Sequence, residues 1–177
     1  MKEIELRRHA AREKGVDALS AEGRVQAENL GRAHPVAFSA AFVSPAKRTA
    51  ETVAWILRGS HQRLPDHAVI EGLATGEEAR WRKAAKAVHT SRLDAVQSKD
   101  PELVAAESQR LAGVVSGLFG DVPEGTTALA VGHSPLIEAA VFGLTGAIVE
   151  PLRECEGINL TLDDAGQYRI EELRLAR

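Results

Sequence analysis

The stretch Ile4-Glu5-Leu6-Arg7-Arg8-His9-Ala10-Ala11-Arg12 decides how the rest of the chain is interpreted. It begins as a short strand in which apolar and charged residues alternate. It then places Arg8 and His9 where the strand should end, and Arg12 follows three residues after the histidine. These side chains are poor candidates for a core, but together they can hold an anion beside an imidazole.

Two later junctions have the same form, an apolar strand followed by a polar tip and a helix start. They are Val43-Ser44-Pro45-Ala46-Lys47-Arg48 and Val131-Gly132-His133-Ser134-Pro135. In the first, a serine before a proline predicts a capped helix with proline at its first position. We expect all three tips to converge on one bound phosphate, because the carboxyl ends of parallel strands meet at one edge of a sheet.

Length and composition set the broad class of the protein. The chain has 177 residues, of which 44% are hydrophobic, 27% charged and only 4% aromatic. This size predicts one domain over residues 1–177, and few aromatics favour helices packed on a sheet. The formal net charge of −3 argues against nucleic acid or an anionic membrane as a partner.

The sequence also predicts a metal-independent protein without a cofactor. The one cysteine excludes an internal disulfide, and no cysteine–histidine cluster has the spacing of a zinc site. The first residues lack the apolar run of a secretory signal, and no segment has the apolar length of a membrane span. We therefore expect a cytoplasmic protein.

Hydrophobic periodicity predicts alternating strands and helices. Strands are expected over residues 2–7, 40–43, 67–70, 127–131, 157–162 and 168–173. Helices are expected from a cap at Ser20 to Ala33 with Pro35 ending it, from Ser44 to Gly59, over 77–88, from Asp100 to Gly120, and over 135–142. The pattern predicts a three-layer α/β/α sandwich with a mostly parallel sheet and an antiparallel carboxyl-terminal edge formed by a hairpin.

Arg48 is informative on electrostatic grounds. It and Lys47 fall in the first turn of a predicted helix, where each cation opposes the helix dipole by about 0.3–1 kcal/mol. An anion between the helix N-terminus and the arginine would remove that penalty. One such arginine alone would be interpreted as a surface residue. Its presence at a second junction, beside Arg8 and His9, favours a binding role.

His9 and His133 would each, in isolation, be interpreted as a capping or core histidine. Two histidines at the ends of two predicted parallel strands favour chemistry. An imidazole can attack phosphorus and carry the phosphoryl group covalently, and a second one can donate a hydrogen bond to the charge that builds on that group. Arginine forks pair with phosphate oxygens, so no metal is required.

The chain resembles the histidine phosphatase superfamily, also called the phosphoglycerate mutase-like family. Residues 6–9 resemble its Arg-His motif, residues 19–27 its L-[ST]-x-x-G-x-x-Q-A helix start, residues 44–52 its S-P-x-x-R-[AT]-x-[QE]-T segment, and residues 131–135 its second-histidine motif. The resemblance implies that His9 is the phosphorylated nucleophile, that Arg8 and Arg48 bind the phosphoryl group, and that His133 completes the pocket. It also implies a phosphoglycerate mutase-like fold.

The chain departs from that family at two points. Ala10 stands where the family has glycine, and Arg12 stands where a small polar residue is more usual, so it is expected to add a third cation to the pocket. Many members protonate the leaving group with a carboxylate after the third strand. Here Glu71, Glu77 and Glu78 are all candidates, and none is preferred.

Three hypotheses follow. We favour a phosphatase that acts on a phosphomonoester or a phosphohistidine, because the segment after the third strand is as short as in the compact phosphohistidine phosphatases. The alternatives are a mutase that moves phosphate within a sugar acid and a catalytically weak phosphate-binding protein on the same fold. The expected partner is a small phosphorylated metabolite or a protein phosphorylated on histidine.

Overall fold

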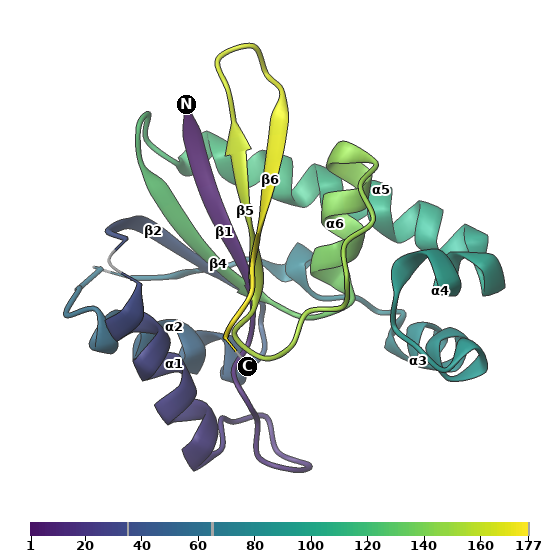
Figure 1. The fold of residues 1–177 in the computed structure, drawn as a ribbon, viewed down its shortest axis with the longest axis horizontal. Helices are drawn as coiled ribbons and strands as arrows, with labels where there is room; N and C mark the ends of the chain where they lie inside the picture. The colour runs from purple at the N-terminus through teal and green to yellow at the C-terminus, as the bar shows by residue number, and fades with distance from the viewer. Residues whose placement is uncertain (35, 65, 177) are drawn as a thin grey trace.

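The computed structural model of the protein describes residues 1–34, 36–64 and 66–176. Within these ranges six strands form one sheet in the order β3-β2-β4-β1-β5-β6 (Figure 1). The strands are β1 (Lys2–Arg8), β2 (Phe38–Val43), β3 (Ala68–Val69), β4 (Thr127–Gly132), β5 (Gly157–Leu162) and β6 (Tyr168–Leu173). The helices are α1 (Ala21–Ala33), α2 (Lys47–Gly59), α3 (Glu78–Val88), α4 (Leu93–Lys99), α5 (Pro101–Leu118) and α6 (Leu136–Thr145).

The topology confirms the predicted fold class. Strands β3, β2, β4 and β1 pair in parallel, whereas β5 pairs antiparallel to both β1 and β6. In Figure 1, β1, β2 and β4 run toward the middle of the view, where their carboxyl ends meet. The turn at residues 163–166 closes the expected hairpin, and both of its strands have the predicted bounds.

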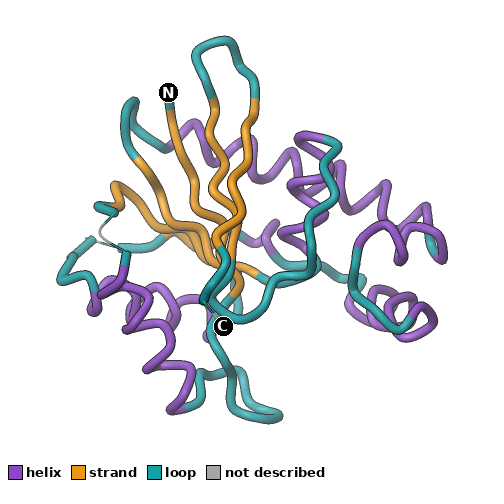
Figure 2. Tube along the Cα trace, viewed as in Figure 1, coloured by secondary structure: helices purple, strands orange, loops and turns teal. Residues whose placement is uncertain are grey.

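Helices cover both faces of the sheet, with α1 and α2 on one side and α5 and α6 on the other (Figures 1 and 2). Strand β4 shows why the sequence requires this arrangement. Ala128 and Ala130 pack in the core below α5 and α6, whereas Leu129 and Val131 pack in the core below α1 and α2. A strand that is apolar on both faces is stable only when both are covered. No helix in the described ranges combines the length and apolar content needed to cross a bilayer.

Several helix boundaries differ from the predictions. Helix α2 begins at Lys47 rather than at Ser44 and Pro45, for a reason given below. Helix α4 was not predicted, because it has only seven residues and two buried positions, too few to show a helical periodicity. Helix α6 continues to Thr145, three residues beyond the expected end, and stops at Gly146, which has a φ of 73°. Ser20 caps α1 as expected through Gly23 N–H, whereas Pro35 lies outside the described residues.

Helices α1 and α2 pack in backbone contact near their carboxyl ends. Gly31 on α1 faces the carbonyl of Ile56, and Gly59 on α2 faces the carbonyl of Glu28. A side chain at either glycine would collide with backbone atoms that cannot move independently. The close approach therefore depends on glycine at both positions.

We predict that Gly31→Ala lowers the free energy of unfolding by about 1–3 kcal/mol, because the added methyl overpacks this contact. The matched control is Gly117→Ala within α5, where an added methyl meets nothing within 4 Å. That change should leave stability unchanged or raise it by about 0.5–1 kcal/mol. Denaturant unfolding of both variants checks the prediction, and equal stabilities would contradict it.

Candidate active site

Backbone hydrogen bonds bring the three junctions together. The N–H of His9 donates to the carbonyl of Gly132 at 3.1 Å, and the N–H of Ser44 donates to the carbonyl of Val131 at 3.2 Å. The end of β4 thus holds the ends of β1 and β2 on either side of itself. An open cavity of about 570 Å³ lies at this edge, and its lining includes Arg8, His9, Arg12, Arg48, His133 and Ser134.

His9 is held with one ring nitrogen directed to the protein backbone. Its Nδ1 lies 2.8 Å from the carbonyl oxygen of Ala10. A carbonyl oxygen can only accept, so Nδ1 carries the proton and Nε2 holds the lone pair. Ala10, which stands in place of a glycine, is fully buried, and its N–H donates to Thr52 Oγ1 at 3.0 Å. Its φ is not positive, so alanine fits this backbone without strain.

His133 has both ring nitrogens engaged. Its Nδ1 lies 3.2 Å from Nη2 of Arg48, and its Nε2 lies 2.7 Å from Oγ of Ser44. A guanidinium group can only donate, so Nδ1 accepts and Nε2–H donates to the serine. The rings of His9 and His133 meet edge to face with centroids 5.4 Å apart. Two neutral imidazoles with assigned tautomers therefore share the cavity.

The surroundings keep both imidazoles neutral. Burial lowers the pKa of His9 to about 4; the hydrogen bond to Ala10 opposes this effect, and the charges of Arg48 and Arg8 add to it. Burial likewise lowers the pKa of His133 to about 3, with Arg48 as the next cause. At neutral pH, His9 therefore presents an unprotonated nitrogen, as a nucleophile must.

Arg48 is fixed by Asp17, a residue that the sequence did not single out. The carboxylate of Asp17 accepts from the backbone N–H groups of Lys47 and Arg48, at 2.9 and 3.3 Å, and from Arg48 Nη1 at 2.8 Å. Partial burial opposes ionisation of Asp17, but these three hydrogen bonds and the charge of Arg48 lower its pKa. Nε of Arg48 is buried and has no partner among the described residues.

The prediction that Ser44 caps α2, with Pro45 at its first position, is wrong. Ala46 occupies the cap position, and Asp17 from the loop before α1 takes over the capping. Ser44 Oγ bonds to His133 and Thr49, and the backbone N–H that it accepts, at 3.3 Å, is that of Ala46, which precedes the helix. The Asp17 carboxylate also offsets the positive charges of Lys47 and Arg48 in the first turn of α2. The sequence alone suggested that a bound anion would do this.

Arg8 is held from the other side of the cavity. Its Nη1 donates to the carbonyl of Leu152 at 2.6 Å, and its Nη2 pairs with Glu154 at 3.1 Å. Arg12 and Arg82 also line the cavity, and within the described ranges neither forms an ion pair or a side-chain hydrogen bond. Four arginines thus surround the histidines, two of them already oriented by carboxylates.

Of the three candidate acids, Glu78 at the start of α3 lines the cavity. Glu71 is an exposed residue of a 3-10 turn and Glu77 precedes α3, and neither lines the cavity. Sequence reasoning missed Asp17, Arg82 and Glu154, which come from loops and from α3. No spacing rule relates them to the histidines. The sequence offered one signal for Arg82, namely its basic side chain within the predicted helix 77–88.

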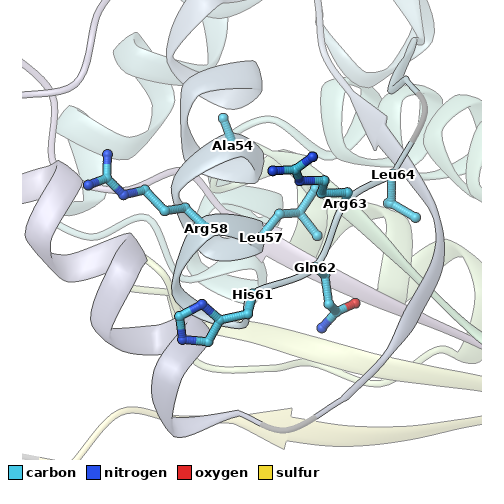
Figure 3. Close-up of a pocket in the computed structure, with 7 residues that line it drawn as sticks. All are labelled: Ala54, Leu57, Arg58, His61, Gln62, Arg63 and Leu64. Atoms are coloured by element: carbon cyan, nitrogen blue, oxygen red, sulfur yellow. The ribbon is translucent and has the colours of Figure 1, made fainter.

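A second depression, of about 580 Å³, lies at the carboxyl end of α2 and is shown in Figure 3. Its lining comes from one continuous segment, residues 54–64. Within this segment, both polar atoms of the Gln62 side chain form hydrogen bonds to the backbone. The Gln62 side chain accepts from Phe38 N–H at 2.8 Å and donates to the carbonyl of Val36 at 2.6 Å. No pair of catalytic side chains converges there, so the cavity beside the histidines is the candidate active site.

Comparison with known proteins agrees with this geometry. The model of the histidine phosphatase superfamily (branch 1) matches residues 5–166, so the chain belongs to that family. No curated protein matches the chain. The family membership confirms the resemblance of the four sequence motifs.

Solved structures share the fold at low sequence identity. A phosphoglycerate mutase from Bacillus anthracis str. Sterne superposes with a TM-score of 0.72 at 18% identity, covering 96% of this chain and 91% of the mutase. A phosphoserine phosphatase from Entamoeba histolytica, in complex with 3-phosphoglyceric acid, gives 0.70 at 17% identity and covers 99% and 98%. The protein histidine phosphatase SixA, complexed with tungstate, gives 0.61 at 19% identity and covers 97% and 96%.

The histidine pKa values predict a specific loss of stability in mild acid. Unfolding returns the histidines to a pKa of about 6.5. Between pH 6.5 and about 4 the unfolded chain therefore binds more protons than the folded one, and the free energy of unfolding falls as the pH falls. Above pH 6.5 both histidines are neutral in the folded and unfolded chain, so they do not lower the free energy of unfolding.

We expect His133→Asn to weaken this pH dependence by about 1 kcal/mol or more between pH 7.5 and 5. Denaturant unfolding at the two pH values, for the variant and the wild type, measures the difference. The same slope in both proteins would contradict a neutral, half-buried His133.

Proposed function

We propose that the protein is a phosphatase that transfers a phosphoryl group to His9 and then to water. The observation that carries the proposal is the pair of neutral imidazoles, 5.4 Å apart, between two oriented arginines. A phosphoryl group bound at this edge would meet Nε2 of His9 and the guanidinium groups of Arg8 and Arg48. Paired, charge-assisted hydrogen bonds from arginine suit its oxygens.

The first step forms a bond between Nε2 of His9 and phosphorus and breaks the bond from phosphorus to the leaving group. The Nδ1–H of His9 keeps its bond to the Ala10 carbonyl, which stabilises the positive charge that the ring acquires. In the second step a water molecule attacks phosphorus, the P–N bond breaks, and phosphate leaves. Arg8 and Arg48 stabilise the charge on the transferred oxygens in both steps, and His133 helps to hold Arg48 in place by accepting from its Nη2.

Glu78 is the carboxyl group that we assign to protonation of an alcohol leaving group, because it alone of the three candidates lines the cavity. A phosphohistidine substrate needs less assistance, since its leaving group is an imidazole. If Glu78 is the general acid, its loss should slow the hydrolysis of alkyl phosphates more than that of a phosphohistidine. The exposed position of Glu78 on α3 lets it approach a substrate from the open side of the cavity.

We predict that Glu78→Gln lowers kcat for alkyl phosphates by about 10²-fold or more, the usual contribution of a general acid. Aryl phosphates such as p-nitrophenyl phosphate, whose leaving group needs no proton, should react at nearly the wild-type rate. The matched control is Glu77→Gln, which removes the same charge one residue away. An equal loss on both substrate types, or in both variants, would contradict the role of Glu78.

The mutase is the second candidate function, and the phosphatase has better support from the chain connecting β3 to α3. Only residues 70–77 join these elements, and three of them form a short 3-10 turn. They leave the cavity open, so water can reach a phosphorylated histidine. A mutase has to exclude water while it holds its intermediate.

Phosphorus NMR of reactions with a panel of phosphomonoesters and a phosphohistidine peptide tests the proposed function. A phosphatase releases inorganic phosphate. A mutase instead produces a new phosphoester resonance from the same substrate. A binding protein changes neither, and that result, or transfer without hydrolysis, would overturn the proposal.

A further inference from the structure

The loop from α6 to β5 forms a cradle around Arg8. The N–H of Arg8 donates to the carbonyl of Glu156 at 2.9 Å, and its carbonyl accepts from the N–H of Cys155 at 3.1 Å. The guanidinium group donates to the Leu152 carbonyl and to Glu154, as described above. Both the backbone and the side chain of Arg8 therefore depend on where this loop lies.

Glu138 fixes the loop from the opposite side. Its Oε1 accepts from the N–H of Leu152 at 2.9 Å and from Oγ of Ser134 at 2.5 Å. Leu152 is thus held at both of its backbone polar groups, with Glu138 on its N–H and Arg8 on its carbonyl. Ser134 follows His133 in the chain and lines the cavity, so one carboxyl group connects to both walls of the site.

An apolar residue would suit the position of Glu138 better on packing grounds alone. The side chain is 1% exposed and stands on α6 among buried Ile137, Ala139 and Ala140. Its Oε2 is buried and has no partner within the described residues. Burying a carboxyl group with one unsatisfied oxygen costs stability, and such a cost is expected where a residue serves function.

We propose that Glu138 is a positioning residue that directs the guanidinium group of Arg8 into the cavity through Leu152. The inference rests on the proposed function, because it takes Arg8 as a ligand of the phosphoryl group. Glu138 does not touch the substrate. Its effect passes through two hydrogen bonds in series, from Oε1 to the Leu152 N–H and from the Leu152 carbonyl to Nη1 of Arg8.

The test measures orthovanadate binding by calorimetry together with kcat and KM for p-nitrophenyl phosphate. Glu138→Leu keeps the volume but removes both acceptor bonds, and it should weaken vanadate binding and kcat/KM by about 10-fold or more. Glu138→Gln retains an oxygen at the position of Oε1 and should restore both to within about threefold of wild type. Failure of the glutamine variant to restore binding would overturn the proposal.

A double-mutant cycle with Arg8→Ala separates positioning from a merely structural role. If Glu138 acts through Arg8, Glu138→Leu should cost less than about twofold once Arg8 is absent. An equal loss in both backgrounds would show that Glu138 acts elsewhere. The control is Glu107→Gln, another buried glutamate, which is bonded to Thr75 and Arg110 rather than to the loop around Arg8, and which should be additive with Arg8→Ala.

Three further outcomes each lead to a decision. If Glu138→Leu does not fold, the same double-mutant cycle is measured with Glu138→Asp, which draws the carboxyl group back by one methylene. If the wild type binds vanadate but hydrolyses no phosphoester, the proposed function fails and the cycle on binding still decides the role of Glu138. If the wild type binds no vanadate, Arg8 is not an oxyanion ligand and the inference fails.

Discussion

The parallel pairing of β1 and β2 with β4 is the constraint on which the rest of the structure depends. Its register places Arg8 opposite Gly132 and Val43 opposite Val131, so the polar tip of each strand begins at the same level. His9 and Ser44 then complete the ladder through their backbone N–H groups. A shift by one residue would send the side chains of a whole strand to the opposite face and separate the two histidines.

Two of the four arginines at this edge are each held by a carboxylate through one nitrogen of the guanidinium group. Asp17 holds Arg48 and Glu154 holds Arg8. Both pairs are partly exposed, so their contribution to stability is small. Their value lies in orientation, because an arginine whose direction is already set loses less entropy when an oxyanion binds.

The sequence could predict the scaffold because periodicity and strand ends are local features. The apolar run at 128–131 required two covered faces, and the polar tips marked where the parallel strands end. For the same reason Arg8, His9, Arg48 and His133 could be grouped from the order of residues alone. Arg12 was also placed at the cavity, whereas the choice among three glutamates needed the path of the chain between β3 and α3.

What could not be predicted are the contacts made across long sequence separations. Asp17 caps a helix that begins thirty positions further along, and Glu138 reaches a loop fourteen residues away. A serine before a proline looked like a cap, but the side chain of Ser44 was taken by His133. The motif around Ser44 suggested a local partner, and the tertiary structure offered a different one, whereas Asp17 and Glu138 lie outside the four motifs.

Rapid-quench trapping with a phosphorus-labelled substrate tests directly whether His9 carries the phosphoryl group. Label should enter the protein before phosphate is released, it should be acid-labile and alkali-stable as a phosphohistidine is, and peptide mapping should place it on His9. The label should also decay at a rate no slower than turnover. Release of phosphate without labelled protein at any time, or label at a residue other than His9, would contradict this role of His9.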